Sequence, residues 1–338
     1  MAYKITLIPG DGIGKEITKA TTKVLEYLDV KIDWDVAEAG LTAFKKYHDP
    51  LPINVIKSID NNKVALKGPL TTPIGKGFRS VNVALRKEFE LYVNKGPAKT
   101  FKGIKSLHYE DIDLIIFREN LEEFYSGIEH YIDSSRSAAE TIGIITRRGS
   151  ERIIMFAFDY AMKHSRKKLT AVHKANILKF TGGLFLDIAE EIAPQYPEIK
   201  FEDKIIDNMA MQMVMNPNQF DCIVTTNLFG DILSDLASGL VGGLGMAPGA
   251  NIGNGIAIFE AVHGSAPDIA GQNIANPTAQ ILAAVMMLEY LGEVEVAKKI
   301  EKAVASVIAK GKCVTKDLNP DNFVGTSEFA EAVINELE

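Results

Sequence analysis

Two aspartates, Asp231 and Asp235, lie four residues apart in the stretch NLFGDILSDLASG, which runs from Asn227 to Gly239. Apolar residues recur at helical spacing through this stretch, so we expect a helix that carries both carboxylates on one face. Like charges at that spacing repel one another and destabilise a helix. Mg²⁺ typically takes one or two protein carboxylates together with substrate oxygens and water, so a bound metal would remove the repulsion. An exposed face, or ion pairs with lysines, is the alternative that the spacing leaves open.

Further polar residues follow short apolar segments that we expect to be strands. They are Lys67, Thr71 and Thr72 in KGPLTTP, Arg118, Glu119 and Asn120 in FREN, His173, Lys174 and Asn176 in VHKAN, and Asp207 and Asn208 in IDN. Ligands of α/β sheets usually bind outside the carboxyl ends of the strands. One polar strand end is more often only the place where a strand meets solvent. Several such ends together favour a site.

Three other stretches have the composition of binding loops or helix starts. IPGDGIGKE lacks the glycine spacing of a dinucleotide-binding turn, so we interpret it as a tight turn between a strand and a helix. The long loop at residues 262–279 is a better nucleotide candidate, because Asp268 can accept hydrogen bonds from a ribose diol and would repel a 2′-phosphate. Ser80, Asn82 and Arg86, near the start of a helix expected at residues 81–93, suit a carboxylate ligand. An N-cap serine and a surface arginine are the alternative there.

Composition excludes several classes of protein. The chain has 338 residues, of which 46% are hydrophobic, and a formal net charge of -7, so we expect no nucleic-acid partner and no membrane association. Its two cysteines lack metal-like spacing, and the first residues enter a strand directly, so we expect a cytoplasmic protein. Strand-like and helix-like segments alternate along the chain, which indicates an α/β protein with a largely parallel sheet.

Taken together, these segments resemble the β-decarboxylating dehydrogenases, which include isocitrate, isopropylmalate and homoisocitrate dehydrogenases. The resemblance runs from IPGDGIGKE to the C-terminal helices, and its most specific motif is NLFGDILSDLASGLVGGLGMAPGANIG. It implies an isocitrate/isopropylmalate dehydrogenase-like α/β fold, not the standard Rossmann fold, with two domains around a cleft. The large cofactor-binding domain would comprise residues 1–98 and 246–338, and the small domain residues 99–245. An arm near residues 134–148 would clasp a second subunit, giving a homodimer or a higher homo-oligomer.

The resemblance implies a metal-assisted oxidative decarboxylation. Asp231 and Asp235 would be ligands of Mg²⁺ or Mn²⁺, and Asp207 would be a third ligand that reaches across the dimer interface. The metal would act as a Lewis acid on the substrate's 2-hydroxyl and the ketone that replaces it. Lys174, also from the partner subunit, would assist in moving the hydroxyl proton, and Tyr125 would protonate the enol that remains after CO₂ leaves.

The same resemblance implies the substrate and the cofactor. The substrate-binding residues would be Lys67, Ser80, Asn82, Arg86 and Arg118. Ser80 and Asn82 favour the third carboxylate of isocitrate, because a buried polar pair facing an isopropyl group would stay unpaired at a cost of about 1–3 kcal/mol per group. The dipeptide Asp268-Ile269 stands where NADP-dependent relatives carry Lys-Tyr, which indicates NAD. The NAD-binding residues would be Thr72, Asn176, His263, Gly264, Asp268, Ile269 and Asn276.

One position departs from the family pattern. Gly96 precedes Pro97 where the family has an arginine that, with Arg86 and Arg118, clamps the substrate's carboxylates. Loss of such a contact costs about 1.5–3 kcal/mol, and Lys95 or Lys99 would replace it only in part, because lysine lacks the bidentate fork. Three interpretations stay open. The chain is an isocitrate dehydrogenase with NAD, a homoisocitrate or isopropylmalate type of enzyme, or a catalytically impaired regulatory subunit.

Overall fold

The computed structural model describes residues 2–73, 77–78, 80–104 and 109–338, and the chain divides into two compact units. Unit 1 is Met1–Phe89, Thr100–Glu110 and Ser238–Glu338, and unit 2 is Glu90–Lys99 and Asp111–Ala237. Both chain ends form unit 1, but the bounds differ from the expected 1–98, 99–245 and 246–338. Residues 93–99 join unit 2 because they form a strand against residues 113–119. The segment that follows returns to unit 1, where Phe101 and Ile104 pack in the core.

Unit 1 contains five strands of a sheet in the order β2-β1-β3-β12-β11. Their bounds are β1 (Tyr3–Ile8), β2 (Ile32–Val36), β3 (Val64–Lys67), β11 (Pro248–Ile252) and β12 (Ala257–Ala261). Neighbouring strands run parallel except for β11 and β12, which form an antiparallel pair. All residues of β3 and β12 are buried, as expected for strands covered on both faces.

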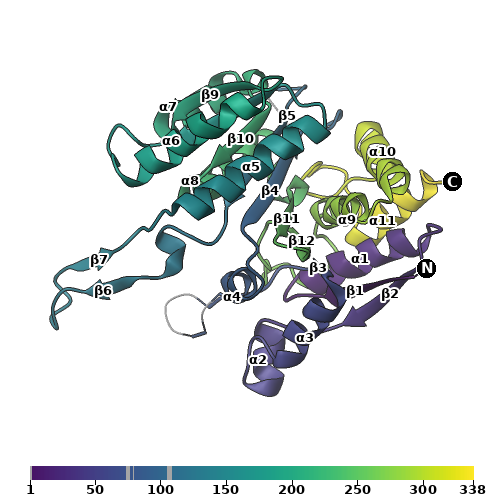
Figure 1. The fold of residues 1–338 in the computed structure, drawn as a ribbon. Coiled ribbons are helices and arrows are strands. Elements are labelled where there is room, and N and C mark those ends of the chain that lie inside the picture. The colour runs from purple at the N-terminus through teal and green to yellow at the C-terminus, as the bar shows by residue number, and fades with distance from the viewer. Residues whose placement is uncertain (1, 74–76, 79, 105–108) are drawn as a thin grey trace. The chain divides into compact units, whose positions relative to one another are not determined.

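Unit 1 also contains helices from both ends of the chain (Figure 1). They are α1 (Gly14–Glu26), α2 (Leu41–Tyr47), α3 (Ile53–Asn62), α4 (Val81–Glu88), α9 (Thr278–Tyr290), α10 (Val294–Lys310) and α11 (Thr326–Asn335). Helix α9 is apolar on every side and buried from Thr278 to Leu288, which is typical of a core helix. Helix α9 packs on β3, β11 and β12 and contacts α1 and α10. The N-terminal helix α1 and the C-terminal helices α9 and α10 therefore share one hydrophobic core.

Unit 2 contains strands in the order β4-β5-β10-β8-β9. Their bounds are β4 (Val93–Lys99), β5 (Asp113–Glu119), β8 (Lys168–His173), β9 (Lys200–Ile205) and β10 (Cys222–Thr225), and β4 alone runs antiparallel to its neighbour β5. The helices are α5 (Arg147–Lys163), α6 (Thr181–Ile192), α7 (Ile206–Met215) and α8 (Asn227–Leu240). The antiparallel pair β6 (Glu129–Tyr131) and β7 (Ala139–Thr141) forms an exposed hairpin that projects from this unit (Figure 1).

The structure confirms the α/β class and the largely parallel pairing, and it corrects two local predictions. The helix expected at residues 81–93 ends at Glu88, because Glu90 has a positive φ of 46° and Val93 already begins β4. Asp207 and Asn208 do not end a strand, because they lie in the first turn of α7. Among the described helices, none is long and apolar enough to cross a membrane.

Candidate functional site

Four side chains of unit 2 converge where β5 ends and α8 begins, and we call them the Tyr125 cluster: Arg118, Tyr125, Asn227 and Asp231. The Arg118 guanidinium donates to Asn227 Oδ1 at 3.0 and 2.7 Å and forms an ion pair with Asp231. The Tyr125 hydroxyl donates to Asp231 Oδ2 at 2.6 Å, and the guanidinium carbon lies 5.0 Å from the centre of the Tyr125 ring. The structure therefore joins one predicted substrate residue, one predicted catalytic residue and one predicted metal ligand.

The electrostatics of this cluster suit a cation beside α8. Burial, followed by the hydrogen bond to Asp231, raises the pKa of Tyr125, which keeps the phenol protonated. Partial burial, together with the charge of Asp231, raises the pKa of Asp235. Within the described part of the chain, the Asp235 carboxylate has no hydrogen bond or ion pair, and each Asp231 oxygen keeps a second lone-pair direction. The two carboxylates therefore fit a hard divalent cation.

Asp207, the third predicted ligand, lies in a different cluster. The Lys174 ammonium, in the loop after β8, donates to Asp207 Oδ1 at 2.5 Å, and this bond lowers the pKa of Asp207. The structure thus joins the two residues that the resemblance assigned to the partner subunit. Among the residues described in this single chain, no three acidic, histidine or cysteine side chains form a metal-binding group.

One predicted substrate residue of unit 1, Lys67, forms a buried ion pair with Glu260, and Arg86 lies near the same carboxylate. The Lys67 ammonium lies 2.6 Å from Glu260 Oε2, and the two residues are only 2% and 6% exposed. Arg86 lies 3.8 Å from the other Glu260 oxygen. Ser80 is the N-cap of α4, because its hydroxyl accepts the Val83 N–H at 3.4 Å, and Asn82 Oδ1 is buried without a hydrogen-bond partner among the described residues. A ligand group that donates a hydrogen bond would satisfy that acceptor, which otherwise costs about 1–3 kcal/mol.

Gly96 lies in β4 opposite Ile116, and a Cβ built on it meets no atom within 4 Å. The site therefore has room for a side chain. Lys95 is directed elsewhere, because its ammonium lies 4.7 Å from the centre of the Tyr160 ring in α5. Successive side chains of a strand point to opposite faces, so Lys95 does not occupy the place of a side chain at Gly96. Lys99, at the end of the strand, is exposed.

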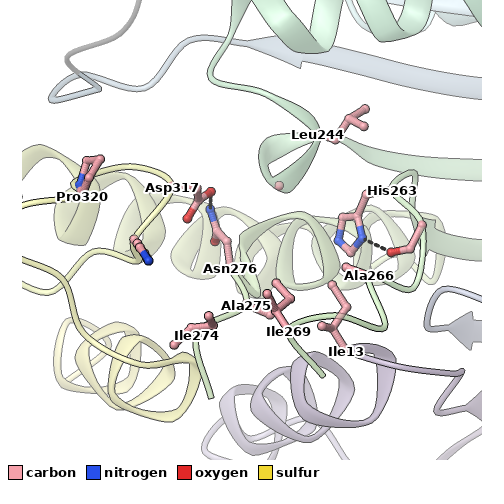
Figure 2. A pocket seen from close by; sticks show the side chains of 13 residues that line it. Ile13, Leu244, His263, Ala266, Ile269, Ile274, Ala275, Asn276, Asp317 and Pro320 are labelled. Atoms are coloured by element: carbon pink, nitrogen blue, oxygen red, sulfur yellow. Dashed lines mark hydrogen bonds between the residues drawn. The ribbon is translucent and has the colours of Figure 1, made fainter. Parts of the chain in front are cut away.

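A second feature of unit 1 is a pocket of about 750 Å³, shown in Figure 2. Four predicted NAD-binding residues, His263, Gly264, Ile269 and Asn276, line it. His263 Nδ1 lies 2.9 Å from Gly264 O, and burial lowers the pKa of this imidazole. Asn276 donates to Asp317 Oδ2 at 2.9 Å on the other side of the pocket (Figure 2).

Three predicted NAD-binding residues are absent from this lining. Asp268 lies in the same loop as His263 but is exposed, and Thr72 is exposed in the loop after β3. Asn176 is exposed in unit 2, in the loop after β8. Sequence reasoning missed other lining residues, namely Ile13, Leu244, Gly245, Ala266, Ile274, Ala275, Lys316, Asp317 and Pro320. Of these, Ala266, Ile274 and Ala275 belong to the loop at residues 262–279 that the sequence indicated, whereas Ile13 belongs to the glycine-rich turn, which we interpreted only as a tight turn.

That turn supports the pocket loop. A Cβ on Gly12 would lie 2.0 Å from Ser265 O, so only glycine allows this close approach of the two backbones. The buried carboxylate of Asp11 accepts the backbone N–H groups of Leu41, Thr42 and Thr71 at 2.8–2.9 Å, and the Thr71 hydroxyl lies 2.6 Å from that of Ser265. The glycines and Asp11 therefore hold loops from three parts of unit 1 together.

Comparisons with known proteins identify the family and the fold of the chain. The isocitrate/isopropylmalate dehydrogenase family model matches residues 4–333. Catalytic subunit 6 of the mitochondrial NAD isocitrate dehydrogenase of Arabidopsis thaliana is 49% identical over 99% of this chain and 88% of its own length. An NADP isocitrate dehydrogenase of Thermus thermophilus is 48% identical over 98% of this chain and 67% of its own length. The crystal structure of isocitrate dehydrogenase from Methylococcus capsulatus has a TM-score of 0.97 and 55% identity, covering 99% of both chains.

Proposed function

The chain belongs to the isocitrate/isopropylmalate dehydrogenase family, and we propose that it oxidises and decarboxylates D-isocitrate with NAD⁺ to give 2-oxoglutarate, CO₂ and NADH. The observation that carries this proposal is the 2.6 Å hydrogen bond from the Tyr125 hydroxyl to Asp231. It sets a protonated phenol, the proposed proton donor, against a carboxylate that is a proposed metal ligand. The proposed setting is a homodimer or higher homo-oligomer in the cytoplasm.

Asp231 and Asp235, with Asp207 from a second subunit, would hold Mg²⁺ or Mn²⁺. When bound, this ion supplies Lewis-acid stabilisation of charge on the substrate's oxygens. Lys174 would take part in moving the 2-hydroxyl proton while hydride leaves C2 for NAD⁺. After CO₂ leaves, the Tyr125 hydroxyl would give its proton to the substrate carbon that carried the lost carboxylate.

Isocitrate is preferred over a substrate with an alkyl chain because of α4. The side-chain amide of Asn82, through its N–H groups, and the guanidinium of Arg86 suit a third carboxylate and would be poorly matched by an isopropyl group. NAD is preferred because Asp268 would repel a 2′-phosphate.

A second candidate function is that of a regulatory subunit that binds isocitrate or nucleotide without turnover. Gly96 favours it, because a carboxylate clamp with two arginines holds the substrate less tightly than one with three. An isopropylmalate or homoisocitrate substrate is the alternative within the same chemistry.

The test is NADH formation by the purified chain with Mg²⁺ and D-isocitrate, compared with NADP⁺ in place of NAD⁺ and with homoisocitrate and isopropylmalate in place of isocitrate. We expect turnover with isocitrate and NAD⁺. Turnover of another acid would replace the proposed substrate. Binding of isocitrate by calorimetry without turnover of any acid would support the regulatory subunit instead.

A further inference from the structure

We propose that Glu123 is a positioning residue whose carboxylate anchors the Tyr125 segment to the start of α8 and so sets the Tyr125 hydroxyl against Asp231. The inference rests on the proposed function, because that function gives Tyr125 its role as the proton donor. Among the described residues, no hydrogen bond or ion pair joins Glu123 to Asp207, Asp231 or Asp235, and our proposal gives Glu123 no contact with the substrate.

Glu123 has a backbone conformation that its residue type rarely adopts. Its φ and ψ are 63° and -141°, and the residue is only 4% exposed. A non-glycine residue in this region of φ and ψ is strained and persists only where its surroundings compensate. The compensation here includes its backbone N–H, which donates to Ile144 O at 2.8 Å, and its carbonyl oxygen, which accepts the Ser126 hydroxyl at 2.8 Å.

The side chain supplies the rest of the compensation. Glu123 Oε2 accepts the Leu228 N–H at 2.7 Å, in the first turn of α8. The first N–H groups of a helix have no partner within the helix, and a carboxylate is favourable there because the helix dipole is positive at this end. A second link lies beside it, because Asn227 Nδ2 donates to Glu122 O at 3.3 Å.

These two links hold the Tyr125 segment close to Asp231. Tyr125 follows Glu123 by two residues within the short helix η1 (Phe124–Ser126), and Asp231 follows Leu228 by three residues within α8. Only a few residues therefore separate the Tyr125 hydroxyl from the Asp231 carboxylate by way of the bond between Glu123 and Leu228. Removal of the Glu123 carboxylate leaves the longer Asn227–Glu122 bond as the remaining link between the Tyr125 segment and the start of α8, so the position of Tyr125 relative to Asp231 should become less well defined.

The experiment compares Glu123→Gly, Glu123→Gln and the matched control Glu90→Gly. Glycine relieves the positive φ and removes the anchor, whereas glutamine keeps an acceptor oxygen at the same reach. Glu90, in the same unit, also has a positive φ (46°), but its side chain is exposed and lies 3.8 Å from Arg148 in a long surface ion pair. Tyr125 function is measured directly as exchange of deuterium from D₂O into the C3 position of 2-oxoglutarate, with Mg²⁺ and without CO₂.

We expect Glu123→Gly to lower both the exchange rate and kcat by roughly 10- to 100-fold, as misplacement of a reacting group does, with little change in the KM for NAD⁺. The exchange rate and kcat of Glu123→Gln should stay within about threefold of those of the parent chain. Those of Glu90→Gly should equal the parent values. Melting temperatures are measured for all three variants to check that each is folded. Parent-level exchange in Glu123→Gly, with only a lower melting temperature, would make Glu123 a helix cap and overturn the proposal.

A readout without turnover separates this inference from the proposed function. With 3-fluorotyrosine at position 125, Asp231→Asn should shift the fluorine resonance in the parent chain. In the Glu123→Gly background the same substitution should no longer shift it. Equal shifts in both backgrounds would contradict the anchor, whether or not isocitrate is the substrate. A parent chain that converts no 2-hydroxy acid but shows the expected fluorine result would reject the proposed function and keep the anchor.

Discussion

At the scale of single residues, Gly96 is the position where a substitution tests the proposed carboxylate clamp. Its Cβ direction is open, so Gly96→Arg introduces a guanidinium without a steric clash at Cβ. We expect the KM for isocitrate to fall by roughly 10- to 100-fold, because a charge-assisted carboxylate contact contributes about 1.5–3 kcal/mol. Steady-state kinetics measure this. Lys163→Arg, at the exposed end of α5, is the control and should leave the KM unchanged. An unchanged or higher KM for Gly96→Arg would show that this position lies away from the bound acid.

Asp268 is the residue that we expect to discriminate between the two nicotinamide cofactors. Asp268→Asn removes the negative charge and keeps the size of the side chain. Because Asp268 is exposed, solvent and salt screen its charge, so we expect kcat/KM for NADP⁺ to rise only by roughly 3- to 10-fold. The gain should shrink at high ionic strength. Asp187→Asn, at an exposed position of α6, is the control for net charge; the same gain in both variants would exclude a local role for Asp268.

At the scale of elements, Glu119 joins the end of β5 to the turn that leads to Tyr125. Its carboxylate accepts the backbone N–H groups of Leu121 and Glu122 at 2.8–3.0 Å and lies 3.8 Å from Arg152 of α5. Burial raises the pKa of Glu119 from 4.5 to about 7. The folded chain therefore holds this proton to a higher pH than the unfolded chain, so the free energy of unfolding falls as pH rises from about 4.5 to about 7.

Glu119→Gln removes this dependence on pH, because the amide stays neutral and keeps an acceptor oxygen. We expect the variant to be more stable than the parent by roughly 3 kcal/mol above pH 7, which is a few degrees in Tm, and the difference to vanish below about pH 4.5. Thermal unfolding followed by circular dichroism from pH 4.5 to 8 measures it. Glu151→Gln, at the exposed surface of α5, is the control and should show no such trend. If the melting temperatures of the parent and Glu119→Gln chains changed in parallel with pH, the buried-acid interpretation would be refuted.

The sequence predicted most where the signal is local. The helix that carries Asp231 and Asp235 has strong apolar periodicity, and the polar ends of β5 and β8 follow apolar runs, so their positions were correctly expected. The pocket was foreseen only through the loop that holds His263 and Asn276. Asp317 contacts Asn276 from 41 residues away, and no local pattern encodes such a contact. The end of α4 was misjudged for a related reason, because pairing of β4 with β5 overrides the helical pattern of residues 89–93.

At the scale of the whole molecule, the two clusters of unit 2 predict how subunits cooperate. Lys174 pairs with Asp207, and Tyr125 pairs with Asp231, and in our proposal each complete site takes the first pair from one subunit and the second from its partner. Lys174→Met and Tyr125→Phe chains should each be inactive alone. Chains that are unfolded together in equal amounts and refolded should recover roughly a quarter of the parent activity, because half of the dimers are mixed and each mixed dimer has one intact site. Each variant unfolded and refolded alone is the control and should recover no activity. Activity that stays at the level of the single variants, despite mixed dimers detected by native mass spectrometry, would mean that each chain builds its own site.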